Sequence, residues 1–125
     1  MTNLQLDNNS IGANGAKAIA EALKVNPVLT NCNLLKNNLD IESVTMLAKI
    51  GAEKGIMLSG MERDETEADF SSRGLEPADA ILIVSDLKVN PVLTKLYLYN
   101  NNLGDAGEKA VREAVKDRSG FELCM

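Results

Sequence analysis

The strongest constraint in this sequence is an internal repeat. The heptapeptide Lys-Val-Asn-Pro-Val-Leu-Thr occurs twice, at Lys24–Thr30 and at Lys88–Thr94. A second pattern, apolar-x-apolar-x-x-Asn-x-apolar, begins at Leu4, Cys32 and Leu96, and a degenerate copy begins at residue 68. Sequence patterns that recur at a fixed spacing of about 20–50 residues are typical of folds built by stacking equivalent units. The chain is therefore expected to form a stack of similar units.

Each copy has the residue periodicity of a strand followed by a helix. The residues before the asparagine alternate in polarity, as in Leu4–Leu6, and predict a strand with one buried face. Apolar residues at helical spacing follow, in the first copy at Ala16, Ile19, Ala20 and Leu23. Pro77 suits a first helical turn, and the Asn-Pro steps at 26–27 and 90–91 suit helix ends. Stacked units of this kind predict parallel strands on one face and helices on the other.

The whole pattern resembles the leucine-rich repeats of the ribonuclease-inhibitor-like class. The clearest copy is Leu93–Gly107, with the sequence Leu-Thr-Lys-Leu-Tyr-Leu-Tyr-Asn-Asn-Asn-Leu-Gly-Asp-Ala-Gly. The resemblance covers the chain apart from roughly Glu53–Glu65. It implies an α/β solenoid, a short horseshoe arc with parallel strands on the concave face and helices on the convex face. We expect residues 1–125 to form a single leucine-rich repeat domain, with four repeats and a truncated fifth strand.

The spacing between the second and third copies is longer than the others and predicts an insert near residues 55–65. Its apolar residues should pack back onto the core, either as an irregular loop or as an extra short strand. They are Ile56, Met57, Leu58 and Met61. The acidic run Glu62–Asp69 lacks the residue spacing of an EF-hand loop, so a solvated loop is expected there.

The two ends of the array differ. The tail Phe121–Met125 reads as the start of a fifth strand, with Cys124 in the position that Leu96 occupies one unit earlier. The first copy has no comparable cap, and Leu4, Leu6 and Ile11 would lie at an exposed sheet edge, which usually pairs with something. Either the chain is a piece of a longer array or it forms a homodimer through this N-terminal edge.

Composition excludes several functions. The chain has no histidine, which removes imidazole catalysis and histidine-ligated metals. No catalytic residues, cofactor or metal site are expected, and the chain is expected not to be an enzyme. The net charge of −5 argues against nucleic-acid or membrane binding, and the longest apolar run, Ala80–Val84, is too short to span a bilayer. Two cysteines and no signal-peptide pattern favour a reducing, cytoplasmic location.

The asparagine that ends each strand has two interpretations, an amide ligand or a structural ladder. The residues concerned are Asn9, Asn37 and Asn101. A structural ladder is favoured, because backbone groups in a turn beside a buried core need hydrogen-bond partners. Arg73 replaces the asparagine in the third copy, and the sequence does not decide whether its side chain reaches solvent or a ligand.

The strand face that points away from the helices is the predicted binding surface, as the family resemblance implies. Strand alternation places both tyrosines of the chain on it, and tyrosine is a rigid anchor suited to protein contacts. The expected contact residues are Tyr97, Tyr99, Lys95, Glu67, Asp69, Asn33 and Gln5. We expect a non-enzymatic module that binds a protein partner. The alternatives are a self-associating fragment of a longer array and a regulatory repeat domain like those of Ran GTPase-activating proteins or NOD-like receptors.

Overall fold

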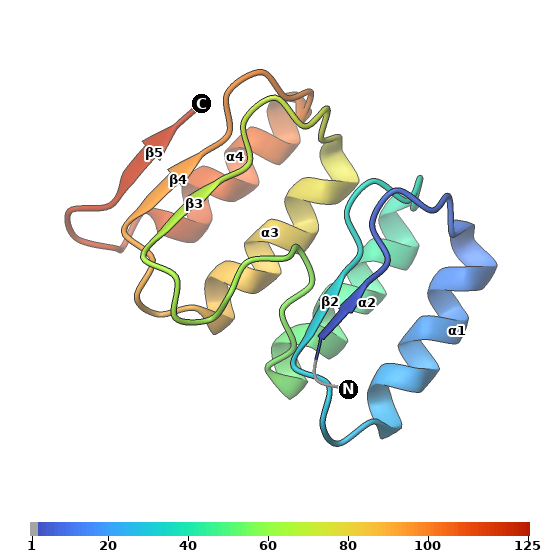
Figure 1. Ribbon diagram of the computed structural model, residues 1–125. Coiled ribbons are helices and arrows are strands. Elements are labelled where there is room, and N and C mark those ends of the chain that lie inside the picture. Colours follow the sequence, from blue (N-terminus) through green and yellow to red (C-terminus); the bar gives the residue numbers. More distant parts are fainter. Residues whose placement is uncertain (1–2) are drawn as a thin grey trace.

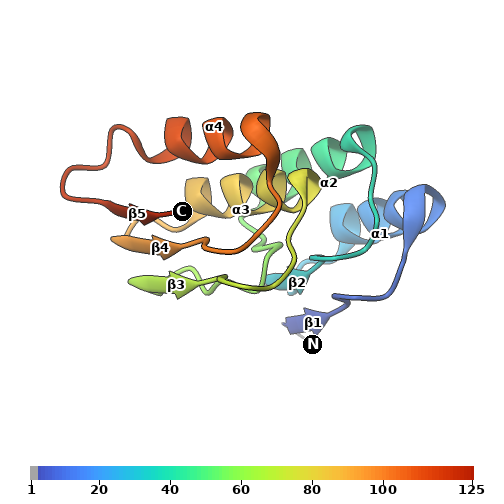
Figure 2. The same cartoon turned by 90° about the horizontal axis from the view of Figure 1, so that it is seen from above.

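The computed structural model describes residues 3–125 and shows a mixed α/β fold in two layers. The strands lie in one layer and the helices in the other, without a closed barrel (Figures 1 and 2). The helices among these residues are α1 (Gly12–Val25), α2 (Ile41–Lys54), α3 (Pro77–Val89) and α4 (Gly104–Val115). The strands are β1 (Asn3–Gln5), β2 (Asn31–Asn33), β3 (Glu67–Asp69), β4 (Lys95–Tyr97) and β5 (Glu122–Cys124). The expected alternation of strands and helices is confirmed.

The strands form two parallel sheets. In the first, β1 pairs with β2, and Leu4 lies opposite Cys32. In the second, β4 lies between β3 and β5, and Ala68 lies opposite Leu96. Both pairings join residues that are 28 positions apart, which is the spacing of the sequence repeat.

The insert separates the two sheets. Met57 forms a parallel bridge with Asn31. The N–H groups of Cys32 and Leu34 donate to the carbonyl oxygens of Met57 and Leu58, at 2.8 and 2.9 Å. The insert therefore takes the place beside β2 that β3 would otherwise occupy. The insert, residues 55–65, is otherwise irregular, with this single bridge and no strand of its own.

The fifth strand is present, but its expected register is wrong. Leu123, and not Cys124, lies opposite Leu96, and Cys124 lies opposite Tyr97. The physical reason is the alternation of the tail, in which Phe121, Leu123 and Met125 all pack against the core. The paired residues of β4 and β5 are one position closer in the sequence than the paired residues of β3 and β4. Cys124 therefore points to the outer face of the sheet.

The core lies between the two layers. Small side chains such as Ala16, Ala20 and Ala80 are buried where the helices face the strands, which allows close packing. The repeated heptapeptide ends α1 and α3 in the same way. The side-chain oxygen of Asn26 accepts hydrogen bonds from two following backbone N–H groups, and that of Asn90 does the same. Pro77 begins α3, as expected.

Cys32 is fully buried in this core, in agreement with its expected role as a small apolar residue. Burial raises the pKa of its thiol to about 11, so the thiol stays protonated at neutral pH. None of the helices within residues 3–125 is long and apolar enough to cross a bilayer.

Candidate functional site

The second sheet carries most of the predicted contact residues on its outer surface, which we call the C-terminal strand face. It is formed by Glu67, Asp69, Lys95, Tyr97, Tyr99, Glu122 and Cys124. β3, β4 and β5 supply all of these residues except Tyr99, which lies in the turn after β4. In the parallel register, Glu67, Lys95 and Glu122 form one row. The next row holds Asp69, Tyr97 and Cys124. The structure therefore brings Glu67, Asp69, Lys95 and the two tyrosines together.

Lys95 is held within this face by two neighbours. Its Nζ atom lies 3.1 Å from a carboxylate oxygen of Glu122 and 5.1 Å from the centroid of the Tyr97 ring. Tyr97 and then Glu122 raise the pKa of Lys95 above its usual value, so the ammonium group remains charged. The face thus binds one of its own cations by combining an aromatic ring with a carboxylate.

The rest of the face is open and acidic. Tyr99 is 48% exposed, and a hydrogen bond with Cys124 is the main cause of its raised pKa. The backbone N–H of Ser71 donates to Asp69 Oδ1 at 2.9 Å and lowers the pKa of Asp69, which therefore stays ionised. Glu67 is exposed, and within residues 3–125 it forms no ion pair shorter than 4 Å.

Asn33 was expected on the open face, and this expectation is wrong. Asn33 is only 8% exposed, because the insert folds over β2. Gly60 of the insert approaches Asn33 closely, since a Cβ atom there would lie 2.8 Å from Asn33 Nδ2, and its φ of 87° favours glycine at this position. Gln5 is exposed as expected, and its side chain accepts a hydrogen bond from Asn33 at 3.2 Å. Both residues belong to the first sheet and are therefore separate from the tyrosines.

A polar cavity of about 130 Å³ lies between the two sheets. Its lining includes Gln5 and Asn33 from the first sheet, Gly60 from the insert, and Asp69 and Arg73 from the second sheet. Arg73 donates to the carbonyl oxygen of Asp69 at 3.1 Å and lies over the Phe70 ring at 5.1 Å. Its side chain therefore stays on the strand face at the border of this cavity.

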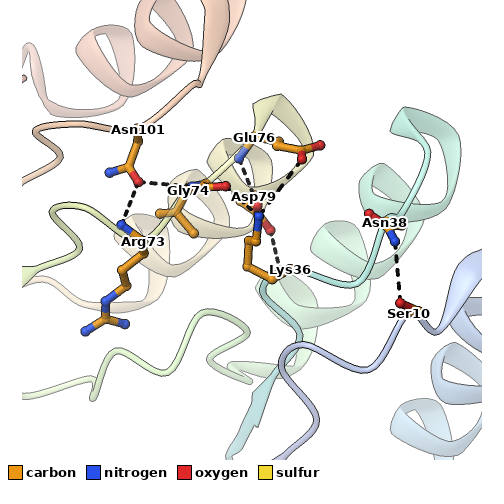
Figure 3. Close-up of polar contacts among 9 residues, drawn as sticks. Ser10, Lys36, Asn38, Arg73, Gly74, Glu76, Asp79 and Asn101 are labelled. Atoms are coloured by element: carbon orange, nitrogen blue, oxygen red, sulfur yellow. Dashed lines mark hydrogen bonds and ion pairs between the residues drawn. The ribbon is translucent and has the colours of Figure 1, made fainter.

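The asparagine side chains make hydrogen bonds to the backbone across neighbouring units. Asn37 Nδ2 donates to the carbonyl oxygens of Leu6, Leu34 and Leu35, and its Oδ1 accepts from the N–H of Asn9. Asn101 is arranged in the same way and accepts from the N–H of Arg73, as Figure 3 shows. In this arrangement the amides bind backbone groups, which is what the structural interpretation requires.

Asp79 supports the turn between Arg73 and α3, a role that the sequence did not indicate. One oxygen of Asp79 accepts from the N–H of Lys36 and the other from the N–H of Glu76, both at 2.9 Å. Lys36 Nζ donates to the carbonyl oxygen of Gly74 at 2.7 Å (Figure 3). These contacts join the second unit to the third.

Asp86 is the second residue that the sequence did not single out. Its carboxylate is fully buried and accepts hydrogen bonds from the N–H groups of Leu58 and Ser59, at 2.7 and 2.8 Å. The Ser59 hydroxyl donates to it at 2.5 Å. Asp86 thus fixes the insert to α3. In this way it also holds in place the part of the insert that covers Asn33. Burial raises its pKa to about 7.

This pKa predicts a pH dependence of stability. Between about pH 4 and 7 folded Asp86 holds a proton that the unfolded chain has lost, so its contribution to stability falls as the pH rises, by at most about 1.4 kcal/mol per pH unit. Hydrogen bonds with Ser43 and Ser71 lower the pKa values of Asp40 and Asp69. These two carboxylates change the stability only below about pH 4, where the free energy of unfolding decreases as the pH decreases. Urea unfolding at several pH values should show a shallower slope between pH 4 and 7 for Asp86→Asn, and an unchanged slope would contradict the assignment.

Comparisons with known proteins leave the site to be interpreted from its own geometry. No protein-family model matches the sequence. No curated protein matches it either. Among residues 3–125, no group of three or more acidic or cysteine side chains is arranged to hold a metal ion.

Proposed function

We propose that this protein is a short leucine-rich repeat solenoid of the ribonuclease-inhibitor-like class that binds a protein partner through its C-terminal strand face. The unpaired state of Cys32 and Cys124 supports a cytoplasmic location, where thiols stay reduced. In this proposal the helices and the asparagine amides are the scaffold, and the exposed side chains of β3 to β5 make the contacts.

The repeat assignment is supported by the register of the strands. Both β1–β2 and β3–β4 pair residues that are 28 positions apart in parallel. The same spacing separates Asn9 from Asn37 and Arg73 from Asn101, which are joined by hydrogen bonds. An arrangement in which chemically similar positions contact each other across one period is expected of stacked repeats.

The binding assignment depends on one observation. In a chain with only four aromatic residues, the two tyrosines lie two residues apart, Tyr97 at the end of β4 and the exposed Tyr99 in the turn that follows it. Tyrosine buries a large apolar ring while its hydroxyl group can still form hydrogen bonds, and it is enriched among residues that contribute most to binding energy.

The test is capture of a partner from a lysate by the wild-type chain and by the double variant Tyr97→Ala with Tyr99→Ala. We expect the double variant to lose at least about tenfold in affinity, because truncating an interface anchor costs about 2 kcal/mol or more. Val25→Ala with Val92→Ala is the matched control, since both valines are exposed apolar residues away from this face. Equal capture by the tyrosine variant and the wild type would exclude this site.

Self-association through the N-terminal edge is the second candidate. Leu4 and Leu6 are only half-buried, whereas their equivalents Cys32 and Leu34 are buried in the next unit. A neighbour beside β1 would complete their burial. Analytical ultracentrifugation distinguishes the two candidates, because a monomer at high concentration argues against the dimer.

A further inference from the structure

We propose that the C-terminal strand face recognises a basic, extended segment of its protein partner, with an arginine or lysine side chain over the Tyr99 ring and its charge beside Asp69. This inference rests on the proposed function and specifies the chemistry of the partner.

The charges on the face favour a cationic ligand. It carries three carboxylates, those of Glu67, Asp69 and Glu122, against one ammonium group, and the Arg73 guanidinium lies at its border. That ammonium group, on Lys95, already pairs with Glu122 at 3.1 Å. The charge of Glu67 is left for a ligand. Asp69, whose pKa is lowered mainly by hydrogen bonds with Ser71 and also by the nearby Arg73 charge, stays ionised. Opposite charges across an interface speed association and select the correct partner.

One example of the contact that we propose lies on the face, and a second, over the buried Phe70 ring, lies at its border. Lys95 lies over the Tyr97 ring at 5.1 Å and reaches a carboxylate, and Arg73 lies over the Phe70 ring at 5.1 Å. Within residues 3–125 no cation lies over Tyr99, although its ring is 48% exposed. The ring–cation attraction contributes about 0.5–1 kcal/mol at such exposed sites.

The spacing of the face suits an extended chain. Tyr97 and Tyr99 project from alternate positions of one chain segment, about 7 Å apart, and Glu67 and Asp69 do the same on β3. Alternate side chains of an extended peptide have the same separation. A segment in which every second residue is basic could therefore contact both rows at once.

The test uses a nine-residue peptide in which arginine alternates with glycine or serine, titrated at about 0.1 M salt into the ¹⁵N-labelled full chain and followed by NMR. The comparison peptide carries citrulline, which is uncharged, in place of arginine. We expect the arginine peptide to perturb the amide signals of residues 67–71 and 95–99. The variant Glu67→Gln with Asp69→Asn should weaken binding by about fivefold or more, as the loss of two exposed ion pairs predicts.

The control variant is Glu42→Gln with Glu53→Gln, which changes the net charge equally on exposed positions of α2. It should bind within about twofold of the wild type, because exposed charges more than about 10 Å away are largely screened at ordinary ionic strength. Equal binding of the citrulline peptide, an equal loss in the control variant, or perturbations confined to the helices would each overturn the inference. If the tyrosine-dependent capture succeeds while the arginine peptide fails, the proposed function stands and the basic partner is excluded.

Discussion

Asp86→Ala is expected to lower the free energy of unfolding by about 3–5 kcal/mol. The substitution leaves two buried N–H groups, those of Leu58 and Ser59, and the Ser59 hydroxyl without their acceptor. Each buried polar group that loses its partner costs about 1–3 kcal/mol. Since domains of this size are stable by only about 5–15 kcal/mol, the loss should be visible in both urea and thermal unfolding.

Two further variants separate the hydrogen bonds from the packing. Asp86→Asn keeps one side-chain oxygen in nearly the same volume and should lose about half as much stability, about 1–3 kcal/mol. Asp79→Ala is a comparison variant, since that aspartate is also buried and accepts two backbone N–H groups, but it lies in the first turn of α3 and accepts no hydrogen bond from the insert residues Leu58 and Ser59. If Asp86→Ala unfolds within about 0.5 kcal/mol of the wild type, the carboxylate does not anchor the insert.

Local sequence patterns were sufficient to predict the strands and helices. Alternating and helical spacings reflect which side of each segment is buried, and the repeat supplies this information several times over. The register of β5 was predicted wrongly because a fixed spacing was applied to a tail that is one residue shorter. The alternation of Phe121, Leu123 and Met125, visible in the sequence, was the better guide.

The candidate site was harder to predict, for a different physical reason. Strand alternation correctly places Tyr97 and Tyr99 on the outer face, because that property is local. Whether a side chain stays exposed depends on what else folds over it, and Asn33 is covered by an insert that comes more than twenty residues later. Asp86 forms its contacts with the same insert, so no pattern within its own helix distinguishes it from a solvent-exposed acid.

The second large effect is expected at Asn37. Asn37→Ala removes an amide that is 2% exposed and that donates to three carbonyl oxygens while accepting the N–H of Asn9. We expect a loss of about 2–4 kcal/mol in the free energy of unfolding, because the carbonyl groups of two neighbouring units lose their donor. Urea denaturation measures this loss directly.

Asn9→Ala is the matched control, because Asn9 has the same place in the first copy of the pattern but is exposed, and its side chain donates only to carbonyl groups of its own turn. It should cost less than about 1 kcal/mol. Asn37→Asp tests the donors separately, since it keeps an acceptor for the Asn9 N–H but places an oxygen against three carbonyl groups. If Asn37→Ala costs no more than Asn9→Ala, or if Asn37→Asp is as stable as the wild type, the asparagines are not a structural ladder. Their amides would then be free to serve as ligands, and the proposed division of the protein into a scaffold and a binding face would be wrong.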